Sequence, residues 1–87
     1  MYLHLGDEVI IPYREIVGIF DLDNVTATKA GRTFLQTAER AGRVYTITEN
    51  LPRSFVVTTM GGRETIYISP ISAATLRGRM SRGIGVE

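Results

Sequence analysis

The sequence predicts a small α+β domain built on a largely antiparallel sheet, in the order β-β-β-α-β-β-β-α. Most of the chain consists of short apolar runs ended by Gly, Pro or Asp, which is typical of strands. Two stretches instead repeat their apolar residues with the 3.6-residue period of a helix. Because 87 residues suffice for one core only, we expect a single domain over residues 1–80 and a frayed C-terminal tail over residues 81–87.

The first third of the chain predicts three strands. Residues 2–5 and 9–11 flank a Gly-Asp turn, and Pro12 ends the second strand because it has no N–H to donate. Residues 16–20 are continuously apolar, so we expect the third strand to be buried on both faces. The acidic segment 21–24 then closes this strand.

Residues 26–41 predict an amphipathic helix with a basic outer face. Its inner arc holds Ala27, Ala30, Phe34, Leu35, Ala38 and Ala41. Its outer arc holds Lys29, Arg32, Gln36, Arg40 and Arg43. Candidates for the N-cap oxygen are Asn24, Thr26 and Thr28. Gly42 stands where a glycine commonly ends a helix, and Gly31 on the inner side indicates close packing.

Strands resume after this helix. Residues 44–48 predict a strand, and residues 49–53 predict a loop. Residues 54–59 and 64–69 predict a hairpin around a Gly-Gly turn. A proline stops the last strand, and a serine two residues later can cap a second helix over about residues 73–80.

The residue inventory argues against an enzyme or a metal protein. There is no Cys, and His4 is the single His, so cysteine–zinc sites and multi-histidine centres are excluded. Asp21 and Asp23 follow a strand, but a metal site would need further acids from other loops, so we interpret them as turn residues. We therefore expect no catalytic residue, no cofactor and no small-molecule substrate.

The N-terminal residues show no targeting segment. Residues 1–5 lead straight into Gly-Asp-Glu, without a basic region or an apolar stretch of signal length. The longest apolar stretches, residues 9–12 and 16–20, are far shorter than the ~20 residues that span a bilayer. These observations predict a cytoplasmic protein with no membrane partner.

The net charge of +1 conceals an uneven distribution. Residues 1–23 hold five acidic residues and one arginine, a net charge of −4, whereas residues 24–87 hold nine cations and four acidic residues, a net charge of +5. Such asymmetry is a hint of a polyanion partner. It also suits association of copies head to tail, because an acidic face of one copy can meet a basic face of the next.

The basic residues are the best functional candidates. One helical face carries four cations: Lys29, Arg32, Arg40 and Arg43. They could contact phosphates along a duplex, although the same pattern is typical of an ordinary solvent-exposed helix face. Arg53, in a Pro-containing loop, could enter a narrow minor groove or be an ordinary loop charge. Further cations near the C-terminus extend this patch or balance a helix end; they are Arg77, Arg79 and Arg82.

Four segments carry a resemblance to a known family: residues 1–8, 14–21, 52–57 and 67–76. Together they closely resemble the Rem family of bacterial biofilm and extracellular-matrix regulators. The resemblance implies a small cytosolic protein that promotes expression of matrix and biofilm genes. It also implies double-stranded DNA as the partner, because one branch of the family activates transcription as a ring of identical subunits that binds DNA through arginines.

The resemblance assigns two site residues. Arg14 matches a family arginine that follows the second strand, and Arg53 alone can stand in for a pair of adjacent arginines in the family's later loop. The leading hypothesis is therefore a ring-forming, DNA-binding transcriptional regulator. The alternative is an oligomeric interaction scaffold that binds a protein partner without touching DNA.

Overall fold

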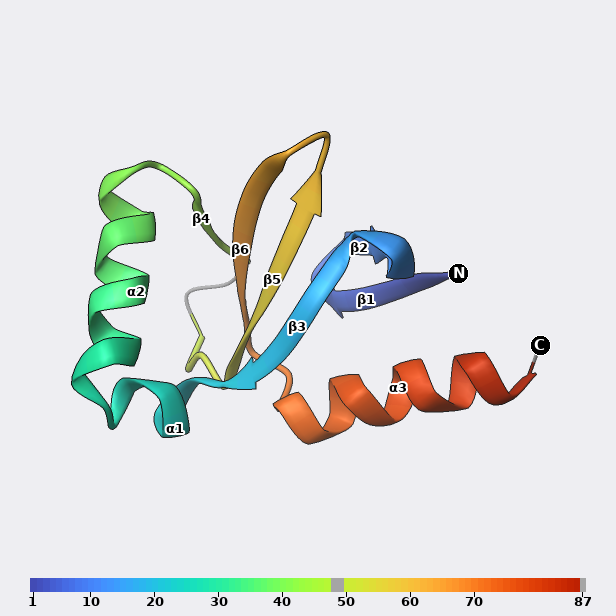
Figure 1. Cartoon of the computed structure of the whole chain (residues 1–87). Coiled ribbons are helices and arrows are strands. Elements are labelled where there is room, and N and C mark those ends of the chain that lie inside the picture. The colour runs from blue at the N-terminus through green and yellow to red at the C-terminus, as the bar shows by residue number, and fades with distance from the viewer. Residues whose placement is uncertain (48–49, 87) are drawn as a thin grey trace.

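The computed structural model describes residues 1–47 and 50–86, which form two sheets and flanking helices (Figure 1). A two-stranded antiparallel hairpin consists of β1 (Tyr2–Gly6) and β2 (Val9–Pro12). The larger sheet has the strand order β3-β5-β6-β4, with bounds Ile16–Asp21, Ser54–Met60, Arg63–Ser69 and Val44–Thr46. The helices are η1 (Tyr13–Glu15), α1 (Leu22–Thr26), α2 (Lys29–Arg40) and α3 (Ala73–Val86). The predicted α+β class is confirmed, and the parallel pair β4–β6 is the exception to antiparallel pairing.

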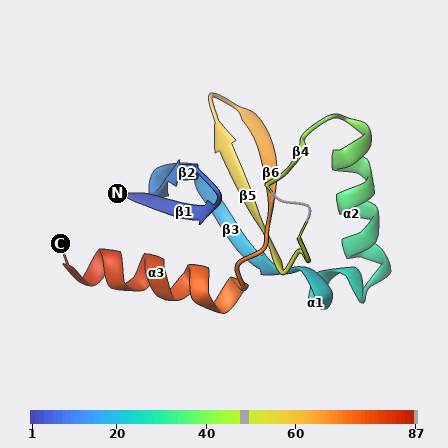
Figure 2. The ribbon, with the colours of Figure 1, turned by 180° about the vertical axis from the view of Figure 1, so that it is seen from behind.

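The larger sheet separates two apolar cores. Because successive side chains of a strand point to opposite faces, β5 sends Val56 to one core and Phe55 with Val57 to the other. The hairpin and α3 close the first core, where Leu3 and Leu76 are buried. Helix α2 lies on the side of the second core, so α2 and the hairpin lie at opposite ends of the molecule (Figures 1 and 2).

The expected hairpin around Gly61 and Gly62 is confirmed as β5–β6. Both glycines have positive φ, at +59° and +80°, which the favoured two-residue turns of hairpins require. The register pairs Ser54 with Ser69 and Met60 with Arg63. This hairpin forms the centre of the larger sheet.

The third strand differs from its prediction. β3 is an edge strand, and the side chain of Val17 is 64% exposed and that of Phe20 39% exposed. The strand is apolar throughout because its two faces meet different apolar regions. Ile19 is buried in the core on the hairpin side, whereas Val17 and Phe20 face α2. The expectation of burial on both faces is therefore wrong.

The helix predicted over residues 26–41 is present as α2, which begins at Lys29, and a separate short helix, α1, precedes it. Asp21 caps α1 by accepting a 3.0 Å hydrogen bond from the Asn24 N–H, so the acidic segment begins a helix instead of only ending a strand. Thr28 is the N-cap of α2 and accepts a 3.0 Å bond from the Gly31 N–H. Close packing at Gly31 is confirmed: a Cβ there would lie 2.0 Å from the Val25 carbonyl oxygen.

The last helix extends further than expected. The sequence predicted an end near Met80, and α3 continues to Val86 through two glycines. A helix already nucleated can propagate through a glycine, which costs only about 1 kcal/mol. Within the described residues, the helices are too short or too polar to cross a bilayer.

Candidate nucleic-acid interface

The outer face of α2 carries three exposed cations, Lys29, Arg32 and Arg40. The Thr28 cap fixes where the helix begins, and the 3.6-residue period then places these side chains away from the sheet. The Arg32 guanidinium donates a 2.9 Å hydrogen bond to the Thr26 carbonyl, which keeps it close to the helix N-terminus. Three of the four cations predicted for this face therefore lie on a solvent-facing surface.

Arg43 lies apart from this row. Its side chain is partly buried and pairs with the Glu64 carboxylate of β6. Its main chain is also fixed, since the Arg43 N–H donates to the Ala38 carbonyl and the Arg43 carbonyl accepts from Ile66. Arg43 thus joins the end of α2 to the sheet, and its charge is already balanced.

Arg53 is held at the end of the sheet where β3 leads into α1. Its N–H donates a 2.9 Å bond to the Ser69 carbonyl, and its carbonyl accepts a 3.1 Å bond from Leu22. The side chain itself is exposed. A rigid main chain with a free guanidinium is what an arginine needs to contact a phosphate or enter a groove without a large loss of conformational entropy.

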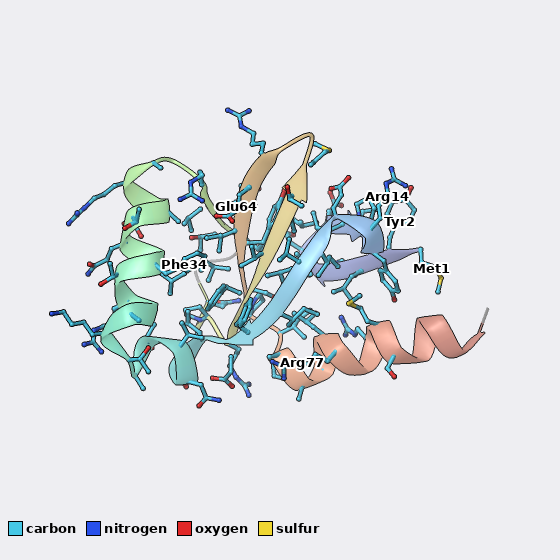
Figure 3. All side chains as sticks on the ribbon, in the orientation of Figure 1. Met1, Tyr2, Arg14, Phe34, Glu64 and Arg77 are labelled. Carbon is cyan, nitrogen blue, oxygen red and sulfur yellow. The ribbon has the colours of Figure 1, made fainter. Side chains whose placement is uncertain are left out.

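Arg14 lies in η1, between the hairpin and β3, and its side chain is exposed (Figure 3). Its neighbour Tyr13 fixes this turn in two ways. The Tyr13 N–H donates to the Met1 carbonyl at 3.0 Å, and its hydroxyl donates to the Arg79 carbonyl at 3.3 Å. Arg14 is therefore presented from an anchored position.

The structure does not bring all predicted site residues together. Arg14 precedes β3 and Arg53 adjoins the residue after it, so the six-residue strand separates them by roughly 20 Å. Arg53 lies on the side of α1, which leads into α2, whereas Arg14 lies at the end that carries the hairpin (Figures 1 and 3). One protomer thus presents two separate basic regions.

Three further arginines lie outside the α2 row and the Arg14 and Arg53 positions. Arg63 is exposed beside the β5–β6 turn, a position that the hairpin prediction located without assigning it a role. Arg77 donates a 2.8 Å bond to the Ile19 carbonyl, and Arg79 donates a 3.3 Å bond to the His4 carbonyl. These last two guanidinium groups hold α3 against β3 and β1, and are less available to a ligand than Arg63.

Groups with other chemistry have structural roles. Asp21 caps α1, and the His4 ring nitrogen Nε2 lies 2.6 Å from the Asp7 carbonyl oxygen, to which it can donate. Nowhere in residues 1–47 and 50–86 do three or more His, Asp or Glu side chains gather as a metal site would need.

Comparison with known proteins agrees with the resemblance found in the sequence. No family model matches the chain. The chain is similar to Extracellular matrix regulatory protein B of Bacillus subtilis (strain 168), with 37% identity over 79 residues that cover 91% of this chain and 89% of the relative. Identity at this level, over nearly the whole of both proteins, shows that the chain belongs to the family of extracellular matrix regulatory protein B.

Proposed function

We propose that this protein is a DNA-binding transcriptional regulator of extracellular-matrix genes that acts in the cytoplasm as a ring-shaped homo-oligomer. The observation that carries the proposal is a set of exposed cations without a balancing acid. Arg14, Lys29, Arg40 and Arg53 make no side-chain hydrogen bond or ion pair with the part of the chain that the structure describes. The name of the similar protein, a matrix regulator, supports the regulatory role.

The spacing of these cations suits a nucleic-acid backbone. Lys29 and Arg40 are eleven residues apart on α2, which corresponds to roughly 16 Å along the helix axis. Arg53 adds an exposed cation beside the start of α1, where its carbonyl accepts a hydrogen bond from the Leu22 N–H. Contacts of this kind fix a protein on the duplex and supply affinity without reading sequence.

A ring of copies would strengthen DNA binding in this proposal. One copy can neutralise only a few phosphates, and Arg14 lies at the other end of the molecule from α2, which carries Lys29 and Arg40 (Figure 3). Repeating them around a ring would let several copies bind one DNA molecule, so that weak single contacts add up through high effective concentration. The ring is therefore part of the binding mechanism that we propose.

A gel-shift titration tests the proposal. We would titrate a duplex of several helical turns with the wild-type protein at about 50 mM and about 200 mM salt, because phosphate contacts release counterions and weaken steeply as salt rises. We expect Arg14→Ala and Arg53→Ala each to weaken binding and to lower the salt slope by about one or more. Arg63→Ala is the matched control, since it removes one exposed arginine outside the proposed site.

The outcomes separate the hypotheses. No shift at low salt from an intact oligomer would overturn DNA binding and favour the interaction scaffold. Wild-type affinity in both site variants, or an equal loss in Arg63→Ala, would overturn the residue assignment while leaving DNA binding itself in place.

A further inference from the structure

The loop between β4 and β5 ends in three exposed residues, Leu51, Pro52 and Arg53. Among the large apolar side chains of residues 1–47 and 50–81, that of Leu51 is the most exposed, at 80%. The loop lies at the end of the sheet where β3 leads into α1, and there the Arg53 carbonyl accepts its hydrogen bond from Leu22 (Figures 1 and 2). An apolar side chain thus faces solvent two residues before a proposed DNA contact.

The chain that carries Leu51 has little conformational freedom. Proline fixes its own φ and restricts the residue before it to extended conformations, so Pro52 limits both itself and Leu51. The next residue is held on both sides, since the Arg53 N–H donates to the Ser69 carbonyl and the Arg53 carbonyl accepts from Leu22. These restraints lower the entropy that would be lost when a partner orders the loop.

Exposure alone assigns no role to Leu51, because single exposed apolar residues are common on protein surfaces. Met60 is also 67% exposed, and it pairs with the exposed Arg63 in the β5–β6 ladder. That position belongs to a regular ladder, whereas Leu51 precedes a proline in a loop. The β4–β5 loop is thus distinguished by an exposed leucine, a proline and an arginine with an anchored main chain.

An apolar side chain beside an arginine has a specific use on DNA. Proteins that bind the minor groove insert Leu, Ile, Phe, Met or Pro between bases, which partly unstacks one base step and kinks the duplex. Leu51 and Arg53 are two residues apart, so their Cα atoms are separated by at most about 7 Å. Because the minor groove is about 6 Å wide and successive phosphates of one strand rise by about 3.4 Å, both side chains can reach one groove at adjacent steps.

We propose that Leu51 is a wedge that enters the minor groove of DNA beside Arg53 and partly unstacks one base step. This inference rests on the DNA binding in the proposed function, and it adds the groove that is entered and a local distortion of the duplex. Arg53 supplies positive charge to the phosphates, whereas Leu51 buries its side chain against the bases. Because the two side chains act on different parts of the DNA, experiments can separate them.

Two duplexes that share one strand test the wedge: one is fully paired, and the other has a two-nucleotide bulge at its centre. The bases at a bulge are already partly unstacked, so an inserting side chain does not have to break their stacking itself. Gel-shift titrations at about 50 mM salt would give the ratio of the two affinities for each protein. Circular dichroism would check the fold, and analytical ultracentrifugation would check the assembly.

Four variants separate the wedge from the charge. Leu51→Ala shortens the proposed wedge, and Leu51→Met keeps an apolar side chain of similar volume. Met60→Ala is the matched control, because it also removes an exposed apolar side chain beside an arginine. Arg53→Ala removes the charge and leaves Leu51 in place. All of these positions are exposed, so the substitutions leave both apolar cores unchanged.

We expect the wild type, Leu51→Met and Met60→Ala to bind the bulged duplex at least about tenfold more tightly than the paired one. A factor of ten corresponds to about 1.4 kcal/mol, and unstacking one base step costs more than this. Leu51→Ala should reduce the preference to about twofold or less, because an alanine is too short to insert. Arg53→Ala should weaken binding to both duplexes and retain the preference.

Four outcomes would overturn the wedge. Equal affinity of the wild type for the two duplexes, or an undiminished preference in Leu51→Ala, would show that no side chain at this position inserts, and DNA binding would stand. The same loss in Met60→Ala would show that the effect is not specific to the loop. A folded Leu51→Ala protein that forms a smaller oligomer than the wild type would assign Leu51 to a protein contact. Failure of the wild type to bind either duplex would overturn the proposed function as well.

Discussion

The Ser69 hydroxyl donates a 2.5 Å hydrogen bond to the Leu5 carbonyl, joining residues that are 64 positions apart in the sequence. Both residues are fully buried, and the same hydroxyl accepts a 3.1 Å bond from the Ile71 N–H. One side chain thus connects the N-terminal hairpin, the last strand of the larger sheet and the approach to α3. Gly6 reinforces the junction by packing against Pro70, with φ at +118°.

Ser69→Ala should lower the free energy of unfolding by about 1–3 kcal/mol, because it leaves the buried Leu5 carbonyl without a donor. Denaturant unfolding followed by circular dichroism would measure this loss. Ser81→Ala removes an exposed hydroxyl from α3 and should change stability by less than about 0.5 kcal/mol. Equal stability of the two variants would contradict the role of the Ser69–Leu5 bond.

Gly31→Ala should destabilise the protein by about 1–3 kcal/mol, although replacing glycine inside a helix normally stabilises it by about 1 kcal/mol. The reason is that the new methyl group would collide with the Val25 carbonyl where α1 meets α2. Thermal unfolding would measure the sign of the effect, with Thr33→Ala on the exposed face of α2 as the control. A more stable Gly31→Ala protein would mean that α1 and α2 do not pack this closely.

Arg77→Ala should leave DNA affinity within about twofold of the wild type while it lowers stability by about 1 kcal/mol. The Arg77 guanidinium donates a hydrogen bond to the Ile19 carbonyl on β3 (Figure 3). It therefore stabilises the contact between α3 and the edge of the sheet rather than binding a ligand. Gel shifts and denaturant unfolding of the same preparation would give both quantities. A loss of affinity equal to that of Arg53→Ala would place Arg77 in the interface.

The midpoint of thermal unfolding of the wild-type protein should rise with protein concentration, because the proposed function includes assembly. Assembly stabilises the native state by mass action, since the assembled form is native and unfolded chains do not assemble. Scanning calorimetry over a hundredfold range of concentration would measure the shift. A constant midpoint would show that assembly and folding are not coupled.

Local patterns predicted most of the elements, because turn chemistry and hydrophobic period act within a few residues. The Gly61-Gly62 hairpin and the glycine after α2 were located in this way, and Gly42 has the positive φ of +71° that its position requires. The break at Thr28 was not resolved, because three possible cap residues within five positions compete and only packing against Val25 selects one.

The features that sequence reasoning missed depend on contacts between distant segments. The run from Ile16 to Phe20 looks like a central strand, and only the strand order reveals that β3 is an edge whose exposed side chains line a groove. Helical periodicity identified the cations of α2 correctly. It could not show that Arg43 pairs with Glu64 or that Arg14 and Arg53 lie at opposite ends of one strand.

The strand order also dictates the sequence of folding events. β5 and β6 are adjacent in the chain and close a tight turn, whereas β3 and β4 each pair with a strand that is synthesised later. Loops that are short close fastest. We therefore expect the β5–β6 hairpin to form before the earlier strands pair with it, and the N-terminal hairpin can complete its core only after Ser69 and α3 have emerged. Until those later segments leave the ribosome, the first hairpin lacks the partners that bury it.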